Sequence, residues 1–180
     1  LDLYIGTYKQ YQKKWQKMYK HSFVYSVIEE YVEVDNEFKK KIKNFKLYKD
    51  KDVPTMNYNN FFNIEEKQKL TQLLNTKLKN ILNKYKLTIK DCWIQKYLKN
   101  SYHSLHTHSL DKQSFVWFID GGKKSSPIKF FDIGWPLVST NQSIQIPFNI
   151  GTLLIFPGFL PHEVQVNKTS NRLIVSGNVF

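Results

Sequence analysis

The sequence predicts a mainly β protein with N-terminal helices, built around a jelly roll, which is a double-stranded β-helix. Two observations predict this class. Residues 91–180 hold eight short segments rich in β-branched and aromatic residues, and glycine, proline and asparagine separate them. Eight strands in about ninety residues is a density typical of a jelly roll. Residues 1–90 show helical periodicity instead, and we expect them to support the barrel.

The length of 180 residues fits one domain, 1–180, with a support region at 1–90 and a catalytic core at 91–180. Turn residues such as Gly121-Gly122 and Pro157-Gly158 mark where the expected strands end. The expected strands of the core are 92–98, 102–108, 115–120, 128–132, 144–148, 152–156, 163–166 and 173–180.

The N-terminal half carries the signals for helices. Residues 8–19 have aromatic side chains at helical spacing and predict an amphipathic helix, and 23–34 predict one or two strands. Asp35 is placed to cap a short basic helix that runs to about residue 45. Residues 46–60 contain Pro54 and several Asn and Asp, which predicts a loop. Asn63 and Glu66 form a capping box for one leucine-rich helix that runs to Tyr85.

The composition leaves the partner open. A net charge of +12 raises the possibility of a nucleic-acid partner, but the lysines are spread along the whole chain, as an AT-rich gene would give. No apolar run approaches the ~20 residues of a membrane span, so we expect no membrane partner. Cys92 is the only cysteine, which excludes an intrachain disulfide and favours a reducing, cytoplasmic compartment.

Three of the five histidines are spaced as a metal site on a barrel requires. His106 and His108 are two residues apart, so their imidazoles project from the same face of a strand. His162 comes just after the apolar run 152–157, which predicts another strand, and would close the site. Imidazole suits Fe(II), zinc and copper alike, so the histidines alone do not select the metal.

Arg172 is the only arginine in a lysine-rich chain, and it lies ten residues beyond His162. A planar guanidinium binds a carboxylate through two parallel hydrogen bonds, which a lysine cannot do. A fixed cation just after the last histidine predicts an acidic cosubstrate that reaches the metal from inside the barrel. Fe(II) with 2-oxoglutarate and O2 meets that description.

At these residues the sequence resembles the 2-oxoglutarate/Fe(II) oxygenases, most closely the small oxygenases of phage and bacterial genomes that are related to prolyl hydroxylases. If a phage encodes the chain, the expected cytoplasm is that of the host cell. The resemblance covers roughly residues 92–180. The stretches that carry it are 97–108, 114–119, 151–164 and 171–178.

The resemblance implies a role for each matching residue. His106 and His162 would be iron ligands, and His108 would occupy the position of the family's carboxylate ligand. Arg172 would pair with the distal carboxylate of 2-oxoglutarate. Three further residues would contact the cosubstrate: Tyr97 as a hydroxyl donor, Ser176 as an assisting group on the same strand face as Arg172, and Trp117 as an aromatic wall.

The chain departs from the family at one ligand. Most members have His-x-Asp or His-x-Glu, whereas this chain has His106-Thr-His108. A neutral imidazole in place of a carboxylate leaves the iron one charge more positive. Asp111, three residues on, stays open as the third ligand instead of His108.

Nearby residues have more ordinary interpretations. The odd spacing of His103 from His106 predicts that it faces away from the site. Trp93 and Trp135 are interpreted as core residues, and Glu163 should point to the face opposite His162.

Together these observations predict a dioxygenase that hydroxylates a C–H bond and releases succinate and CO2. The prolyl-hydroxylase likeness favours a protein or peptide substrate, with a prolyl residue as the first candidate. Two alternatives stay open. The basic charge would suit a nucleic-acid base oxygenase, and the missing carboxylate would suit a cupin-like metal- or ligand-binding module without turnover.

Overall fold

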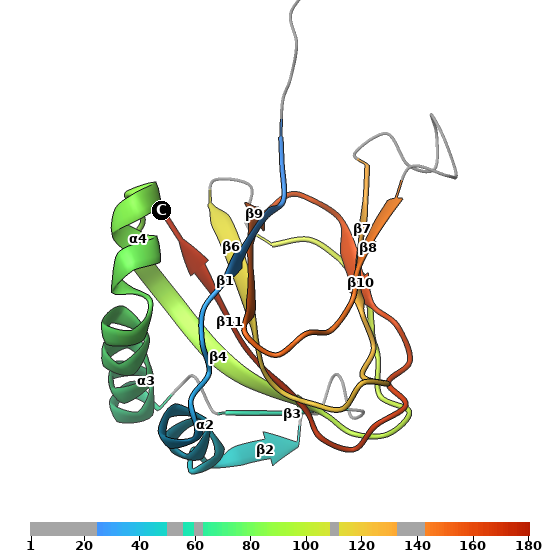
Figure 1. Ribbon diagram of the computed structural model, residues 1–180, viewed down its shortest axis with the longest axis horizontal. Coiled ribbons are helices and arrows are strands. Elements are labelled where there is room, and N and C mark those ends of the chain that lie inside the picture. Colours follow the sequence, from blue (N-terminus) through green and yellow to red (C-terminus); the bar gives the residue numbers. More distant parts are fainter. Residues whose placement is uncertain (1–24, 50–55, 60–62, 109–111, 133–142) are drawn as a thin grey trace, which may run out of the picture.

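The computed structural model describes residues 25–49, 56–59, 63–108, 112–132 and 143–180. The expected amphipathic helix at 8–19 lies outside these ranges, as do Asp111 and Trp135. The described chain forms two antiparallel β-sheets that face one another, with helices on the outer side of the larger sheet (Figure 1). The predicted fold class, a mainly β jelly roll with helices from the first half of the chain, is confirmed.

The larger sheet has seven strands, and its centre is formed by the second half of the chain. In spatial order its strands are β1 (Ile28–Tyr31), β9 (Thr152–Pro157), β6 (Gln113–Asp120), β11 (Arg172–Val179), β4 (Ile89–Tyr97), β3 (Met56–Asn59) and β2 (Leu47–Lys49). The smaller sheet has the order β5 (His103–His106), β10 (His162–Val164), β7 (Ile128–Phe131) and β8 (Ser143–Ile146). Each of the eight strands expected in the core is present with small shifts of its ends.

Strand alternation divides the apolar residues into two cores. On β6, Phe115, Trp117 and Ile119 belong to a cluster on the helix side of the large sheet. Val116 and Phe118 project the other way, into a second cluster between the two sheets. Because successive side chains of a strand point to opposite faces, a continuous apolar run such as 115–119 serves both cores at once. The candidate metal ligands discussed below line the cavity between the two sheets.

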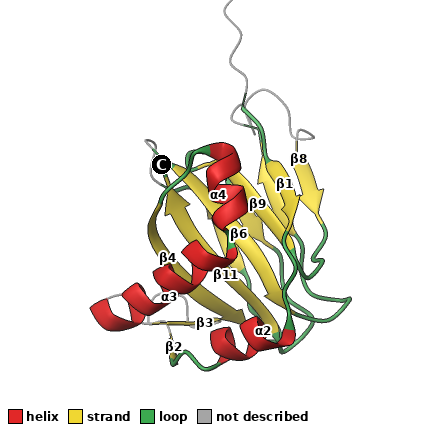
Figure 2. Cartoon of the chain, turned by 60° about the vertical axis from the view of Figure 1, so that its left-hand side comes forward, coloured by secondary structure: helices red, strands yellow, loops and turns green. Residues whose placement is uncertain are grey.

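Three described helices cover the larger sheet (Figure 2). α2 (Asn36–Lys43) begins after Asp35, whose carboxylate accepts a hydrogen bond from the Phe38 N–H at 2.7 Å. α3 (Ile64–Lys77) begins after Asn63, whose side chain accepts from the Glu66 N–H at 3.1 Å, as the capping signal predicts. None of the described helices is long and apolar enough to cross a membrane.

Two predictions for the first half are wrong. The single helix expected from Asn63 to Tyr85 is two helices, because the backbone of Leu78 leaves the helical region (φ −96°, ψ 7°) and α4 (Lys79–Tyr85) starts after it. The loop expected at 46–60 contains β2 and β3, which pair with each other and extend the large sheet beyond β4. Polar residues and Pro54 indicated a loop, but backbone pairing to an open sheet edge does not require an apolar strand.

The helix layer depends on a few fully buried leucines. Leu74 of α3 is 0% exposed and packs in the cluster that includes strands of the large sheet. We predict that Leu74→Ala lowers the free energy of unfolding by ~2–5 kcal/mol, because truncation removes buried methyl groups and leaves a cavity. Urea denaturation measures this. Leu105→Ala is the control, since that side chain is 40% exposed and a surface change should stay within ~0.5 kcal/mol. Equal losses in both variants would contradict the assigned packing.

Candidate metal centre and cosubstrate cavity

The pairing of β5 with β10 brings two of the predicted ligands together. His106, the last residue of β5, lies directly opposite His162, the first residue of β10. Their ring centroids are 4.2 Å apart. His108 follows β5, and its backbone N–H donates to the carbonyl of Gly158 at 2.6 Å, which holds it beside the turn that leads to His162.

The three imidazoles form one group that could hold a metal ion. One ring nitrogen from each of His106, His108 and His162 lies within 4.8 Å of the others. Two nitrogens bound to one ion at ~2.1 Å each are at most ~4.2 Å apart, so the group closes on an ion by small side-chain rotations.

Backbone carbonyls fix the tautomer of two of these rings. Nδ1 of His106 lies 2.7 Å from the Ser104 carbonyl oxygen, and Nδ1 of His162 lies 2.9 Å from the Leu160 carbonyl oxygen. A carbonyl oxygen can only accept, so each Nδ1 carries the proton and donates it. The Nε2 lone pairs are then available to a metal, as they are in most metal-binding histidines.

Burial keeps the three imidazoles neutral. Removal from water lowers the pKa of His162 to about 2, with further lowering from the nearby His106. Burial also lowers the pKa of His108, to about 4, and it lowers the pKa of His106. Metals bind the neutral imidazole, so the site does not need to lose protons near pH 7 before it takes an ion.

The histidines line a cavity of about 130 Å³ between the two sheets. At ~30 Å³ per water molecule, this space suits a small ligand rather than a large one. The remaining wall is formed by side chains of β4, β6, β7, β10 and β11, namely Trp93, Gln95, Tyr97, Val116, Ile128, Val164, Ile174 and Ser176.

His103 lies in this cavity, and the prediction that it faces away is wrong. Its ring stacks on that of His106 with centroids 3.8 Å apart. The cause is a β-bulge, because His106 pairs with His162 and His103 pairs with Val164. Four residues of β5, 103–106, therefore lie opposite three of β10, 162–164, and the extra residue returns His103 to the inner face.

Trp93 is also assigned differently from the sequence interpretation. It lines the cavity, with its ring centroid 6.0 Å from that of His108, rather than filling the helix-side core. Its neighbours on β4, Cys92 and Ile94, occupy that core instead. Trp93 and Tyr97 are four residues apart on β4, so strand alternation places both on the cavity face, and this spacing was visible in the sequence. Glu163 lies outside the cavity wall, as its position next to His162 predicts.

Arg172 is fully buried and pairs across the strands with Tyr97. Its Cζ atom lies 4.4 Å from the Tyr97 ring centroid and 5.1 Å from that of Phe148. Its Nε–H donates to the Ser126 carbonyl at 2.9 Å, while Nη1 and Nη2 have no hydrogen-bond partner among the described residues. Buried N–H groups normally have partners, so these two nitrogens are suited to the carboxylate of an acidic ligand.

The polar groups around Arg172 run along the same face towards the histidines. Ser176 is four residues further along β11, ~13 Å at strand spacing, and pairs with Trp93 beside His108. Its hydroxyl donates to Gln95 Oε1 at 3.2 Å, and both residues line the cavity. Burial raises the pKa of Tyr97 and lowers that of Arg172. Tyr97 is therefore an un-ionised phenol that can donate a hydrogen bond.

Asn167 organises this end of the barrel, and nothing in the sequence pattern marked it. Its side chain is 0% exposed, and its Oδ1 accepts from both the N–H and the hydroxyl of Ser126 at 3.1 Å. Its Nδ2 donates to the carbonyls of Tyr97 and Leu98 at 3.3 and 3.2 Å. Asn167 thus ties the segment that contacts Arg172 Nε to the end of the strand that carries Tyr97.

Trp117 does not line the cavity, so the structure does not support its assignment as the cosubstrate's aromatic wall. It lies on the helix side of β6, where its ring centroid is 4.8 Å from that of Phe38. The cavity receives the neighbouring side chain, Val116. A one-residue difference along a strand moves a side chain to the other face of the sheet.

No protein-family model and no curated protein sequence matches the chain. Solved structures do match it. An oxidoreductase of the 2OG-Fe(II) oxygenase family from Burkholderia pseudomallei aligns with a TM-score of 0.67 at 13% identity, over 85% of this chain and 83% of that one. A prolyl-4-hydroxylase from Pseudomonas putida gives a TM-score of 0.58 at 13% identity, over 87% and 92%. HygX from Streptomyces hygroscopicus, with nickel, 2-oxoglutarate and hygromycin B bound, gives 0.63 at 11% identity, over 86% and 82%.

The chain shares the fold of these structures. Its own residues suit two kinds of ligand, a metal ion and a carboxylate. Three neutral imidazoles form a suitable donor set for Fe(II), and two unpaired guanidinium nitrogens suit the carboxylate of a diacid.

The metal prediction follows from the number of ligands. We expect His106→Ala and His162→Ala each to abolish tight Fe(II) binding, because two protein ligands seldom retain a labile ferrous ion. Iron content after anaerobic reconstitution measures this. Glu163→Gln, which changes a residue next to His162 but outside the cavity wall, should bind iron as the unaltered protein does. Full occupancy in either alanine variant would remove that histidine from the ligand set.

Proposed function

We propose that this protein is an Fe(II)- and 2-oxoglutarate-dependent dioxygenase that hydroxylates a C–H bond of a protein or peptide. The observation that carries the proposal is the buried Arg172, whose Nη1 and Nη2 atoms have no partner among the described residues, on the same strand face as a cavity that three histidines line. A buried cation without a counter-charge is costly unless a ligand completes it. An extended diacid is the ligand that would reach both the guanidinium and the metal.

Each residue of the candidate site then has a defined role. His106 and His162 would hold the ion through Nε2, while the Ser104 and Leu160 carbonyls keep their rings oriented. His108 would complete the ligand set in the position where most of the family has a carboxylate. When bound, Fe(II) with 2-oxoglutarate supplies the oxidation, in which O2 gives one oxygen atom to the substrate C–H bond and the cosubstrate leaves as succinate and CO2.

The cosubstrate would extend from the histidines past Tyr97, which lines the cavity, to Arg172, which pairs with Tyr97 but does not itself line the cavity. Arg172 would hold its distal carboxylate, and the Tyr97 hydroxyl, kept protonated by burial, would donate to the same group. Ser176 and Gln95 provide a polar strip between Arg172 and the histidines. The apolar side chains of Val116, Ile128 and Ile174 exclude water from the remaining wall.

The substrate class rests on fold likeness. A prolyl-4-hydroxylase is among the similar structures, so a prolyl residue in a peptide is the first substrate to test. A small-molecule enzyme, HygX, is among them as well, which means that the fold does not select the substrate.

The direct test is succinate formation. The protein with Fe(II), 2-oxoglutarate and O2 should release succinate, and a substrate peptide should gain the mass of one oxygen atom. Arg172→Lys should weaken the binding of 2-oxoglutarate roughly ten- to hundredfold, because one of the two hydrogen bonds to its carboxylate is lost. Hydrogen bonds to charged groups are worth ~1.5–3 kcal/mol. Calorimetric titration of the Mn(II)-loaded protein measures the affinity.

Two controls make this test specific. Metal affinity should be nearly unchanged in Arg172→Lys, and Lys168→Ala, which removes an exposed positive charge, should bind 2-oxoglutarate normally. Unchanged 2-oxoglutarate affinity in Arg172→Ala would overturn the anchor assignment. Metal binding without succinate under any condition would indicate a binding module without turnover.

The unusual third ligand gives a further prediction. If His108 coordinates, His108→Asp should retain iron and preserve or raise 2-oxoglutarate turnover, because it restores the more common His-x-Asp arrangement. If Asp111 is the ligand, Asp111→Ala should be damaging and His108→Ala mild. Metal titration of the two alanine variants distinguishes these cases.

A further inference from the structure

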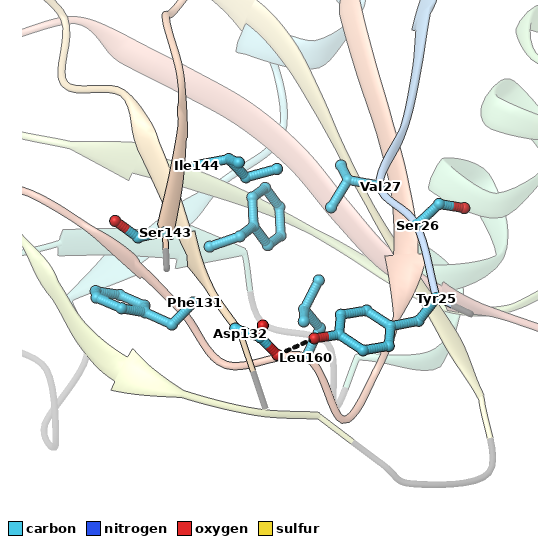
Figure 3. Close-up of a pocket in the computed structure, with 9 residues that line it drawn as sticks. Tyr25, Ser26, Val27, Phe131, Asp132, Ser143, Ile144 and Leu160 are labelled. Atoms are coloured by element: carbon cyan, nitrogen blue, oxygen red, sulfur yellow. Dashed lines mark hydrogen bonds between the residues drawn. The ribbon is translucent and has the colours of Figure 1, made fainter. Parts of the chain in front are cut away.

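A second pocket, of about 340 Å³, lies beside the histidine cavity. It opens between residues 25–27, which lead into β1, and the strands β7 and β8 of the smaller sheet (Figure 3). Its apolar wall includes Val27, Phe130, Ile144 and Leu160. At ~30 Å³ per water molecule it is large enough for a long amino-acid side chain.

The pocket shares its wall with the metal centre. The Phe130 ring centroid is 5.6 Å from that of His162, and the Leu160 carbonyl accepts the hydrogen bond from His162 Nδ1. Both side chains also line the pocket. A group bound here is therefore next to the metal site but separated from it by Phe130 and Leu160, which is the position of a residue that neighbours the oxidised one.

One acidic group stands against these apolar walls. Asp132, the residue directly after β7, lines the pocket, and its Oδ1 accepts a hydrogen bond from the hydroxyl of Tyr25 on the opposite wall (Figure 3). This bond orients the carboxylate across the pocket. An ionised carboxylate offers about four acceptor positions, so Asp132 can also accept from a ligand.

We infer that this pocket binds a lysyl-type side chain, with an aliphatic stem and a cationic head, carried by the peptide substrate next to the oxidised residue. The stem would pack on Val27, Ile144 and Leu160, and the ammonium would meet Asp132. The inference rests on the proposed function for the identity of the neighbouring site. A net charge of +12 repels cationic peptides in general, so any preference for lysine must come from a local carboxylate.

The test compares two acetylated, amidated peptides, Ala-Lys-Pro-Lys-Ala and its counterpart with norleucine in place of both lysines. Norleucine keeps the aliphatic stem and lacks the charge, and lysine on both sides of proline covers either direction of binding. NMR titration of the metal-free protein gives both affinities without any need for turnover. The lysine peptide should bind at least about tenfold more tightly, as expected for a charge-assisted hydrogen bond.

Variants assign the preference to the pocket. Asp132→Asn is close to isosteric and should reduce the preference for lysine to less than about threefold. Glu33→Gln removes the same charge from an exposed position and should leave the preference intact. Equal binding of the two peptides, tighter binding of the norleucine peptide, or an unchanged preference in Asp132→Asn would overturn the inference.

The binding test and the function test fail separately. If the lysine preference is present but no succinate is formed with iron and 2-oxoglutarate, the proposed oxidation is wrong and the peptide site stands. If succinate is formed but the lysine preference is absent, the oxygenase stands and the pocket assignment is wrong.

Discussion

The register between β5 and β10 is the constraint on which the site depends. It sets His106 opposite His162, and the bulge in the same ladder brings His103 onto the same face. A one-residue slip would turn the imidazoles outward and leave the cavity without donors. Within the smaller sheet, β10 is held between β5 and β7, and Phe130 of β7 packs against His162. The large sheet contributes Phe156 of β9, which packs against the same histidine.

Charge is distributed unevenly along the inner face. Arg172 is a buried cation at one end of β11. The neutral imidazoles lie near Ser176, four residues further along that strand, and line the same cavity as Ser176. Asp132 lies in the second pocket, on the other side of Phe130. Arg172 and His162 are oriented by hydrogen bonds to backbone carbonyls rather than by other charges. Asn167 and the Ser126 carbonyl orient the guanidinium, and the Leu160 carbonyl orients His162. Such contacts position a charged ligand without neutralising the group that must bind it.

The sequence was informative where a pattern is local. Strand alternation and turn residues placed the core strands, and the two-residue spacing of His106 and His108 placed them on one side. It was less informative where the outcome depends on a partner strand. The bulge that turns His103 inward arises from pairing with β10, and β2 and β3 form because the edge of β4 is open to them. Trp117 and Asn167 show the same limit, since a position on one face or a set of backbone carbonyls becomes visible only in three dimensions.

The three-histidine donor set has a consequence for the cosubstrate. Among the described residues that line the cavity there is no carboxylate. In the proposed complex a divalent ion and Arg172 contribute three positive charges, and a 2-oxoglutarate dianion leaves one uncompensated. With the common carboxylate ligand the same sum would be zero. Charges in a dry cavity interact more strongly than in water, so this site should favour dianionic over monoanionic ligands more than a His-x-Asp site does. An acidic residue near the substrate would partly offset this extra positive charge. Asp132 is such a residue, because it lines the pocket whose wall includes Phe130, and Phe130 contacts His162.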